Sequence, residues 1–151
     1  MMSELDNLYQ ELIVDHSKHP RNFGKLDPHD HEATGYNPLC GDKVTVFLQM
    51  ENDRVKAVQF QGVGCAISTA SASLMTERLI GKSQADAEKL FEEFHTLVTK
   101  GELSNADMEK LGKLQAFSGL KEFPMRVKCA TLAWHTFRAA LRGEEPDIAV
   151  E

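Results

Sequence analysis

The segment Pro38-Leu39-Cys40-Gly41-Asp42 places a thiol and a carboxylate two residues apart, with a glycine between them. The alternating run Val44-Thr45-Val46-Phe47-Leu48 follows almost at once and predicts a β-strand. Cys40 is therefore expected in a tight loop that leads into a strand, where Gly41 lets the backbone bend so that both side chains point one way. Thiolate sulfur and carboxylate oxygen are both zinc ligands. The segment predicts part of a metal site, and the rest of the chain has to supply the other ligands.

Length and composition are those of one globular domain, residues 1–151, with 42% apolar and 26% charged residues. The formal charge of −6 argues against a nucleic-acid partner, because non-specific binding needs a basic face. No apolar run predicts a membrane span, and the acidic residues near the N-terminus, Glu4, Asp6 and Glu11, are unlike a secretory signal. Three cysteines in such a chain predict reduced thiols in the cytoplasm. Two interpretations of the cysteines then remain: they form a metal site or include a reactive thiol, or they are three unrelated buried residues.

The periodicity of apolar residues predicts an α+β fold in which a small three-stranded antiparallel sheet packs against about five or six helices. The polar Glu51-Asn52-Asp53 is expected to turn a hairpin, and a hairpin alone is marginal, so a third strand and helical cover are expected. His16 and His19 are expected to end the first helix, where a partly protonated imidazole suits the helix dipole. Residues 116–119 are expected to be a linker. The expected strands are 32–36, 43–50 and 54–61, and the expected helices are 3–19, 65–80, 83–98, 103–114 and 125–142.

The other two cysteines are expected at helices. Cys65 follows Gly64 and stands at or beside the start of a helix of small residues, where the unpaired N–H groups and the dipole favour a thiolate. Cys129 lies in the last helix, three residues after Arg126, so the two share a face. The Arg126 guanidinium can then lie over the Cys129 sulfur, or over whatever that sulfur binds.

These positions define a candidate metal site with four ligands: Cys40, Asp42, Cys65 and Cys129. Zinc held by three thiolates and one carboxylate would set two positive charges against four negative ones, so the site calls for nearby cations. Lys43, Arg126 and Lys128 stand next to a proposed ligand or one helical turn away.

Several short segments spread along the chain match a known family. They are Tyr9, Asp15-His16, Pro20-Arg21-Asn22, Pro38-Leu39-Cys40-Gly41-Asp42, Gly64-Cys65-Ala66-Ile67-Ser68 and Arg126-Val127-Lys128-Cys129. Through them the chain resembles, over nearly its whole length, the SufU branch of the IscU-like iron–sulfur assembly family, which also includes the NifU-like N-terminal domains. The chain differs from the IscU branch in two places. That branch has a histidine immediately before the third cysteine, where this chain has Lys128, and this chain carries roughly twenty extra residues, a helical insertion around 96–114.

The resemblance implies a SufU/IscU-like fold and a zinc-bound sulfur carrier, a sulfur acceptor more than a turnover enzyme. Such a carrier takes persulfide sulfur from a SufS-type cysteine desulfurase and passes it to downstream iron–sulfur assembly components. Cys40 is the expected acceptor because its loop is the most mobile of the three positions, and Arg126 is the expected stabiliser of the thiolate or persulfide charge. An alternative is a scaffold on which an iron–sulfur cluster is assembled on Cys40, Cys65, Cys129 and Asp42, since thiolates suit iron as well as zinc. A third is a purely structural zinc domain.

Overall fold

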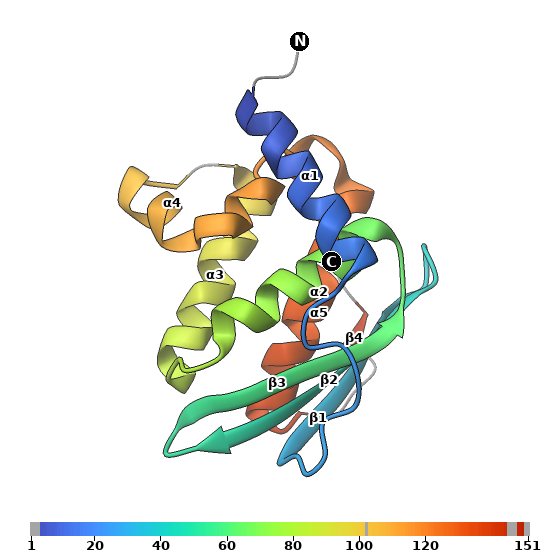
Figure 1. Cartoon of the computed structure of the whole chain (residues 1–151), viewed down its shortest axis with the longest axis vertical. Coiled ribbons are helices and arrows are strands. Elements are labelled where there is room, and N and C mark those ends of the chain that lie inside the picture. The colour runs from blue at the N-terminus through green and yellow to red at the C-terminus, as the bar shows by residue number, and fades with distance from the viewer. Residues whose placement is uncertain (1–3, 102, 145–147, 150–151) are drawn as a thin grey trace.

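A computed structural model describes residues 4–101, 103–144 and 148–149 of the chain (Figure 1). The predicted α+β fold, with three antiparallel strands and five α-helices, is confirmed. A short fourth strand, β4, pairs in parallel with β1 and was not expected from the sequence. The elements follow in the order α1 (Glu4–Lys18), β1 (His31–Asn37), β2 (Asp42–Glu51), β3 (Arg54–Val63), α2 (Ala66–Leu79), α3 (Gln84–Lys100), α4 (Asn105–Leu111), two 3-10 turns (Gly112–Phe117 and Leu120–Glu122), α5 (Pro124–Arg142) and β4 (Ile148–Ala149).

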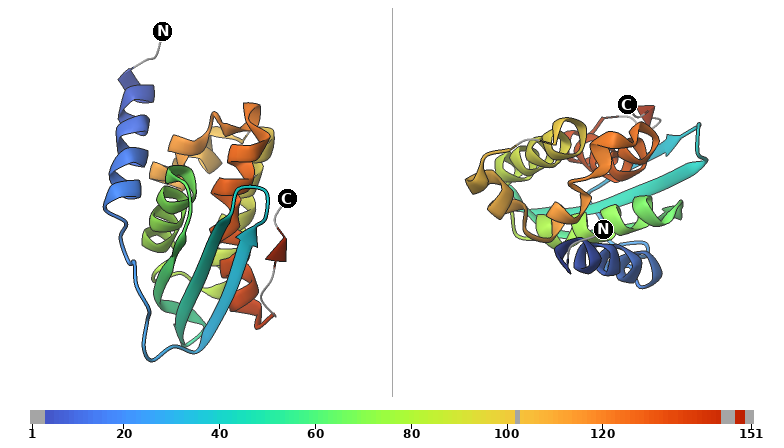
Figure 2. Two further views of the ribbon diagram at one scale, coloured as in Figure 1. Left: turned by 90° about the vertical axis from the view of Figure 1, so that its right-hand side faces the viewer. Right: turned by 90° about the horizontal axis from the view of Figure 1, so that it is seen from above.

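The sheet has the order β3-β2-β1-β4. Its central strand β2 pairs with both neighbours, so that Asp42, its first residue, lies opposite Asn37 of β1. Side chains alternate between the two faces of a strand, and the buried set of β2 includes Val44, Val46 and Leu48. Helices α2 and α5 cover that face, and α3 packs against α5 (Figures 1 and 2).

The core is centred on Trp134 of α5. Its ring stacks on Phe94 of α3 with 4.6 Å between centroids, and Phe94 meets Phe117 edge to face. Phe117 is completely buried at the end of a 3-10 turn. The prediction of a linker over residues 116–119 is therefore wrong, because the burial of one aromatic ring fixes a segment whose local sequence favours a loop.

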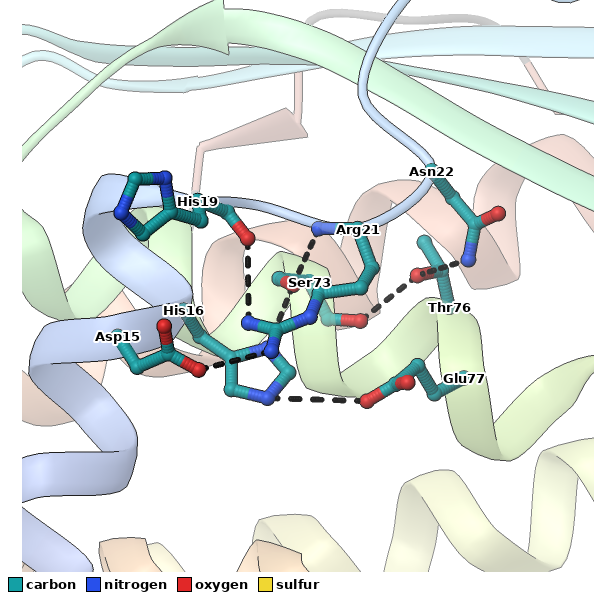
Figure 3. Close-up of polar contacts among 8 residues, drawn as sticks. All are labelled: Asp15, His16, His19, Arg21, Asn22, Ser73, Thr76 and Glu77. Carbon is teal, nitrogen blue, oxygen red and sulfur yellow. Dashed lines mark hydrogen bonds and ion pairs between the residues drawn. The ribbon is translucent and has the colours of Figure 1, made fainter.

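Helix α1 packs on the outer side of α2 (Figure 2). A polar network joins the two, and at its centre the Ser73 hydroxyl lies 2.7 Å from His16 Nδ1 and accepts a hydrogen bond from the Arg21 backbone N–H (Figure 3). His16 is 1% exposed, and its Nε2 lies 3.7 Å from a carboxylate oxygen of Glu77. His16 lies in the last turn of α1, as predicted, but burial lowers its pKa and so disfavours the protonated form that would suit the helix dipole.

Among the helices of the described residues, none combines the length and the apolar character that crossing a bilayer requires.

Candidate metal centre

The loop between β1 and β2 presents Cys40. Because Asn37 pairs with Asp42 across the two strands, only residues 38–41 form the loop, and Gly41 occupies the left-handed region with φ 75°. Cys40 is exposed, whereas Asp42 is 2% exposed at the start of β2. The two side chains nevertheless converge, as the sequence predicts, since a thiol on the loop and a carboxylate on the adjoining strand face the same side.

Cys65 lies beside Asp42 at the start of α2. Its backbone N–H donates to Asp42 Oδ1 at 3.0 Å, and its sulfur lies 3.8 Å from Asp42 Oδ2. Cys65 is also the N-cap of α2, because its sulfur accepts the backbone N–H of Ser68. A Cβ on Gly64 would approach Ser68 Oγ and Asp42 Oδ1 within about 3.1 Å, so a larger residue there would have to displace these side chains slightly. The predicted position of Cys65 at a helix start is confirmed.

Cys129 of α5 lies beside Cys40 in the candidate site. It is 6% exposed in the second turn of the helix, and its sulfur lies 3.6 Å from that of Cys40. Burial raises the pKa of the Cys129 thiol, and contacts with Asp42, Cys65 and Cys40 raise it further. A nearby cation would reverse this effect, because it favours the charged thiolate that burial disfavours.

The four predicted ligands are not equally close. Within the residues that the structure describes, Cys40, Asp42 and Cys129 form a group whose ligand atoms all lie within 4.8 Å of one another. Cys65 is outside that group but in contact with Asp42. Ligand atoms held about 2.0–2.3 Å from a tetrahedral ion lie roughly 3.3–3.8 Å apart. The Cys40–Cys129 separation of 3.6 Å and the Cys65–Asp42 separation of 3.8 Å have this spacing, so these two pairs suit a tetrahedral ion such as zinc. Cys65 is not within 4.8 Å of every other ligand, so it would have to move closer to complete the site.

The three predicted cations differ in exposure. Lys43 and Arg126 are exposed, and Lys128 is half-buried one residue before Cys129. The Arg126 guanidinium lies over the ring of Phe123, 4.7 Å from its centroid, and not over the Cys129 sulfur as the spacing suggested. A cation–π contact at an exposed ring is worth only about 0.5–1 kcal/mol. Arg126 can therefore leave it for a stronger anionic partner.

One residue that contacts the site was not predicted from the sequence. Asn37 is buried, and its side-chain amide donates to the Cys40 sulfur at 3.1 Å. Its position directly before Pro38 and the cysteine loop is the only signal that could have drawn attention to it.

The geometry agrees with comparisons against known proteins. Residues 8–141 match the family described as the NifU-like N terminal domain. The chain belongs to this family. As a NifU-like N-terminal domain it is 38% identical over 141 residues to the "Iron-sulfur cluster assembly scaffold protein IscU" of Streptococcus pyogenes, covering 93% of this chain and 87% of that one. It is 37% identical over 143 residues to the "Zinc-dependent sulfurtransferase SufU" of Bacillus subtilis, covering 95% of both.

A solved structure supports the same assignment. The protein from Fervidobacterium islandicum described as a putative iron–sulfur cluster assembly scaffold protein for the SUF system superposes with a TM-score of 0.82 at 35% identity, covering 93% of this chain and 99% of that one. The NifU-like domain described above is thus a member of the iron–sulfur cluster assembly scaffold and SufU family, and the resemblance found in its sequence is confirmed.

Proposed function

We propose that this chain is a zinc-binding sulfur carrier, which accepts persulfide sulfur from a SufS-type cysteine desulfurase and passes it to iron–sulfur cluster assembly. The ligands are Cys40, Asp42, Cys65 and Cys129. Cys40, Asp42 and Cys129 lie close together, Cys65 is in contact with Asp42, and three thiols with one carboxylate are donors that zinc accepts. The similarity to a relative named as a zinc-dependent sulfurtransferase extends over nearly the full length of both chains and supports the same proposal.

The observation that carries the proposal is the difference in exposure between two adjacent sulfurs. Cys40 is exposed on a four-residue loop, whereas Cys129 is buried in α5 only 3.6 Å away. Cys65 is exposed as well, but its sulfur caps α2 and contacts Asp42. Cys40 can therefore meet a sulfur donor while the other two remain in place.

The transfer step follows from thiol chemistry. The Cys40 thiolate attacks the terminal sulfur of the desulfurase persulfide, and a new S–S bond forms on Cys40. The S–S bond of the donor breaks, and the donor cysteine leaves as a thiolate, so that one sulfur changes carrier with no net oxidation. When bound, zinc would keep the thiols of the site deprotonated. Arg126 is exposed and three residues before Cys129, and once it leaves the Phe123 ring its guanidinium would stabilise the charge on the Cys40 thiolate or persulfide.

The test is Cys40→Ala. Stimulation of a SufS-type desulfurase should be lost, and mass spectrometry should find no added sulfur atom on the chain, while zinc stays largely bound through the remaining ligands. Arg126→Gln should retain zinc and accept sulfur more slowly. Loss of zinc from the Cys40→Ala protein with sulfur transfer intact would contradict the proposal.

The second candidate is a scaffold on which an iron–sulfur cluster is assembled on the same four residues. The name of the Streptococcus pyogenes relative favours it, and thiolate ligands do not distinguish the two metals. Metal analysis separates the candidates. A carrier should purify colourless with stoichiometric zinc, whereas a scaffold should show broad visible absorption and stoichiometric iron.

A further inference from the structure

Asn37 stands where a buried amide meets an exposed loop. It is the last residue of β1 and is 1% exposed, while all four residues of the loop that follows it, 38–41, are exposed. A buried side-chain amide must have hydrogen-bond partners, because leaving one of its polar atoms unpaired costs about 1–3 kcal/mol. The partners of Asn37 therefore indicate what the residue does.

Three of its hydrogen bonds close the loop. The backbone carbonyl of Asn37 accepts the N–H groups of Cys40 at 3.3 Å and Gly41 at 2.8 Å, and the side-chain oxygen accepts the N–H of Leu39 at 3.1 Å. A side-chain oxygen that accepts a backbone N–H two residues on is an ordinary turn contact, which aspartate and, more weakly, serine also make. These three bonds do not require an amide.

The fourth hydrogen bond does. Asn37 Nδ2 donates to the Cys40 sulfur at 3.1 Å. An aspartate carboxylate has no donor, and a serine hydroxyl is one bond shorter and has a single oxygen for both the turn contact and the sulfur. A neutral thiol is a weak acceptor, whereas a sulfur that carries negative charge is a much better one. The amide is thus suited to a charged Cys40 sulfur. Asn37, a buried residue at the base of the loop, thus makes both this hydrogen bond to the Cys40 sulfur and the turn contacts.

We propose that Asn37 is a positioning residue for the sulfur-accepting thiol: its amide holds the Cys40 sulfur beside Cys129 and Asp42, and so sets how firmly the loop stays at the metal. This inference rests on the proposed function for the role of Cys40. Hydrogen-bond partners of metal ligands typically contribute 10–100-fold to metal affinity, which is the scale expected here. The loop itself adds little restraint, because Leu39 is 65% exposed and nothing lies within 4 Å of where a Gly41 Cβ would be.

The test is Asn37→Ser, which keeps an oxygen for the turn but is too short to reach the sulfur. The matched control is Asn22→Ser, since the amide of Asn22 donates to Thr76 Oγ1 at 3.0 Å, in the contact between α2 and the segment that follows α1 (Figure 3). Zinc affinity is measured by competition with a chromophoric chelator. Asn37→Ser should weaken it at least about 10-fold, and Asn22→Ser should leave it unchanged. Equal zinc affinity for the Asn37→Ser and native chains would overturn the proposal.

A double-mutant cycle separates positioning from general folding effects. If Asn37 acts through Cys40, then Asn37→Ser should have no further effect on zinc affinity in the Cys40→Ala background. The same loss in both backgrounds would mean that Asn37 acts on the fold, and the proposal would be wrong. The cycle measures zinc alone, so it still decides the role of Asn37 if sulfur-transfer assays assign the acceptor to another cysteine.

A measurement on the unsubstituted Asn37 covers the case in which Asn37→Ser does not fold. The side-chain amide protons of Asn37 should exchange slowly with solvent in the zinc-bound chain, and their NMR signals should move when Cys40 is replaced by alanine. The amide signals of Asn22 should stay in place. Rapid exchange and unmoved Asn37 signals would contradict the proposed hydrogen bond.

Discussion

Replacing Gly35 by alanine tests how closely α5 must approach the sheet for the candidate metal centre to form. Gly35 is in β1, two residues before Asn37, and its partner across the packing is Thr136 of α5, seven residues after Cys129. A Cβ on residue 35 would overlap Thr136 Oγ1 and would lie 3.3 Å from Leu132 Cδ1. The strand that leads into the Cys40 loop and the helix that carries Cys129 would then have to separate.

The magnitude follows from two contributions. Overpacking of a core costs about 1–3 kcal/mol. Moving Thr136 also disturbs the hydrogen bond that its hydroxyl donates to the Leu132 carbonyl at 2.8 Å, which contributes about 1 kcal/mol. Gly35→Ala should therefore destabilise the chain by roughly 2–4 kcal/mol. At about 2–4 °C per kcal/mol for a chain of this size, thermal unfolding monitored by circular dichroism should shift down by about 4–16 °C.

A second substitution at Thr136 should restore the stability lost in Gly35→Ala. Thr136→Ala removes the overlapping oxygen and leaves Thr136 Cβ at an ordinary contact distance of 3.5 Å. The double variant should therefore regain most of the stability lost in Gly35→Ala. Thr136→Ser retains the oxygen and should not rescue. Effects of Gly35→Ala and Thr136→Ala that add to within about 0.5 kcal/mol would refute the reasoning, because residues in direct overlap must couple.

Three further predictions concern the polar contacts and the metal. Because burial lowers the pKa of His16, the unfolded chain takes up a proton first as the pH falls through about 6.5, so the free energy of unfolding should fall from about pH 7.5 to 5.5. Urea titrations at several pH values should show that this free energy depends less on pH in His16→Gln than in the native chain. An unchanged pH dependence would contradict the assignment to His16. Zinc at a free concentration of about 100 times its dissociation constant should stabilise the fold by about 2.7 kcal/mol. Removing zinc with a chelator should therefore lower the melting temperature by roughly 5–11 °C. An unchanged melting temperature would argue against the proposed zinc site. Ser71→Ala should lower the free energy of unfolding by about 1–3 kcal/mol and change Trp134 fluorescence. The reason is that Ser71 Oγ accepts a hydrogen bond from the indole N–H and donates one to the Ala130 carbonyl. Native-like fluorescence and stability would exclude that bridge.

Local patterns predicted most of the secondary structure because each element buries one face. The stripe through Leu90, Phe94 and Leu97 predicted α3, and the alternation in β2 predicted the central strand. Phe117 was misassigned because the small and polar residues that flank it favour a loop, and only its packing against Phe94 fixes it. The pairing of β4 with β1 joins segments more than a hundred residues apart, which no local pattern contains.

The candidate site divides in the same way. Residue type and the family resemblance were enough to name Cys40, Asp42, Cys65 and Cys129 as candidates, because the chain has only three cysteines and the resemblance singles out Asp42 among its 23 acidic residues. Sequence spacing could not say that Cys65 would lie outside the close group of the other three, since that depends on how α2 meets β2. The contact between Asn37 and Cys40 also depends on side-chain orientation at a strand end, which sequence does not specify.

The attachment of α1 has a consequence for hydrogen exchange. Of the α1 side chains whose burial the structure describes, His16 is the only buried one, Leu12 and Ile13 are partly buried, and Leu8 is 60% exposed. An element held by few apolar contacts opens at a free energy below that of global unfolding. Backbone amides of α1 should therefore exchange for deuterium through a local opening in which α1 detaches, while those of α2 and α5 wait for the whole domain to unfold.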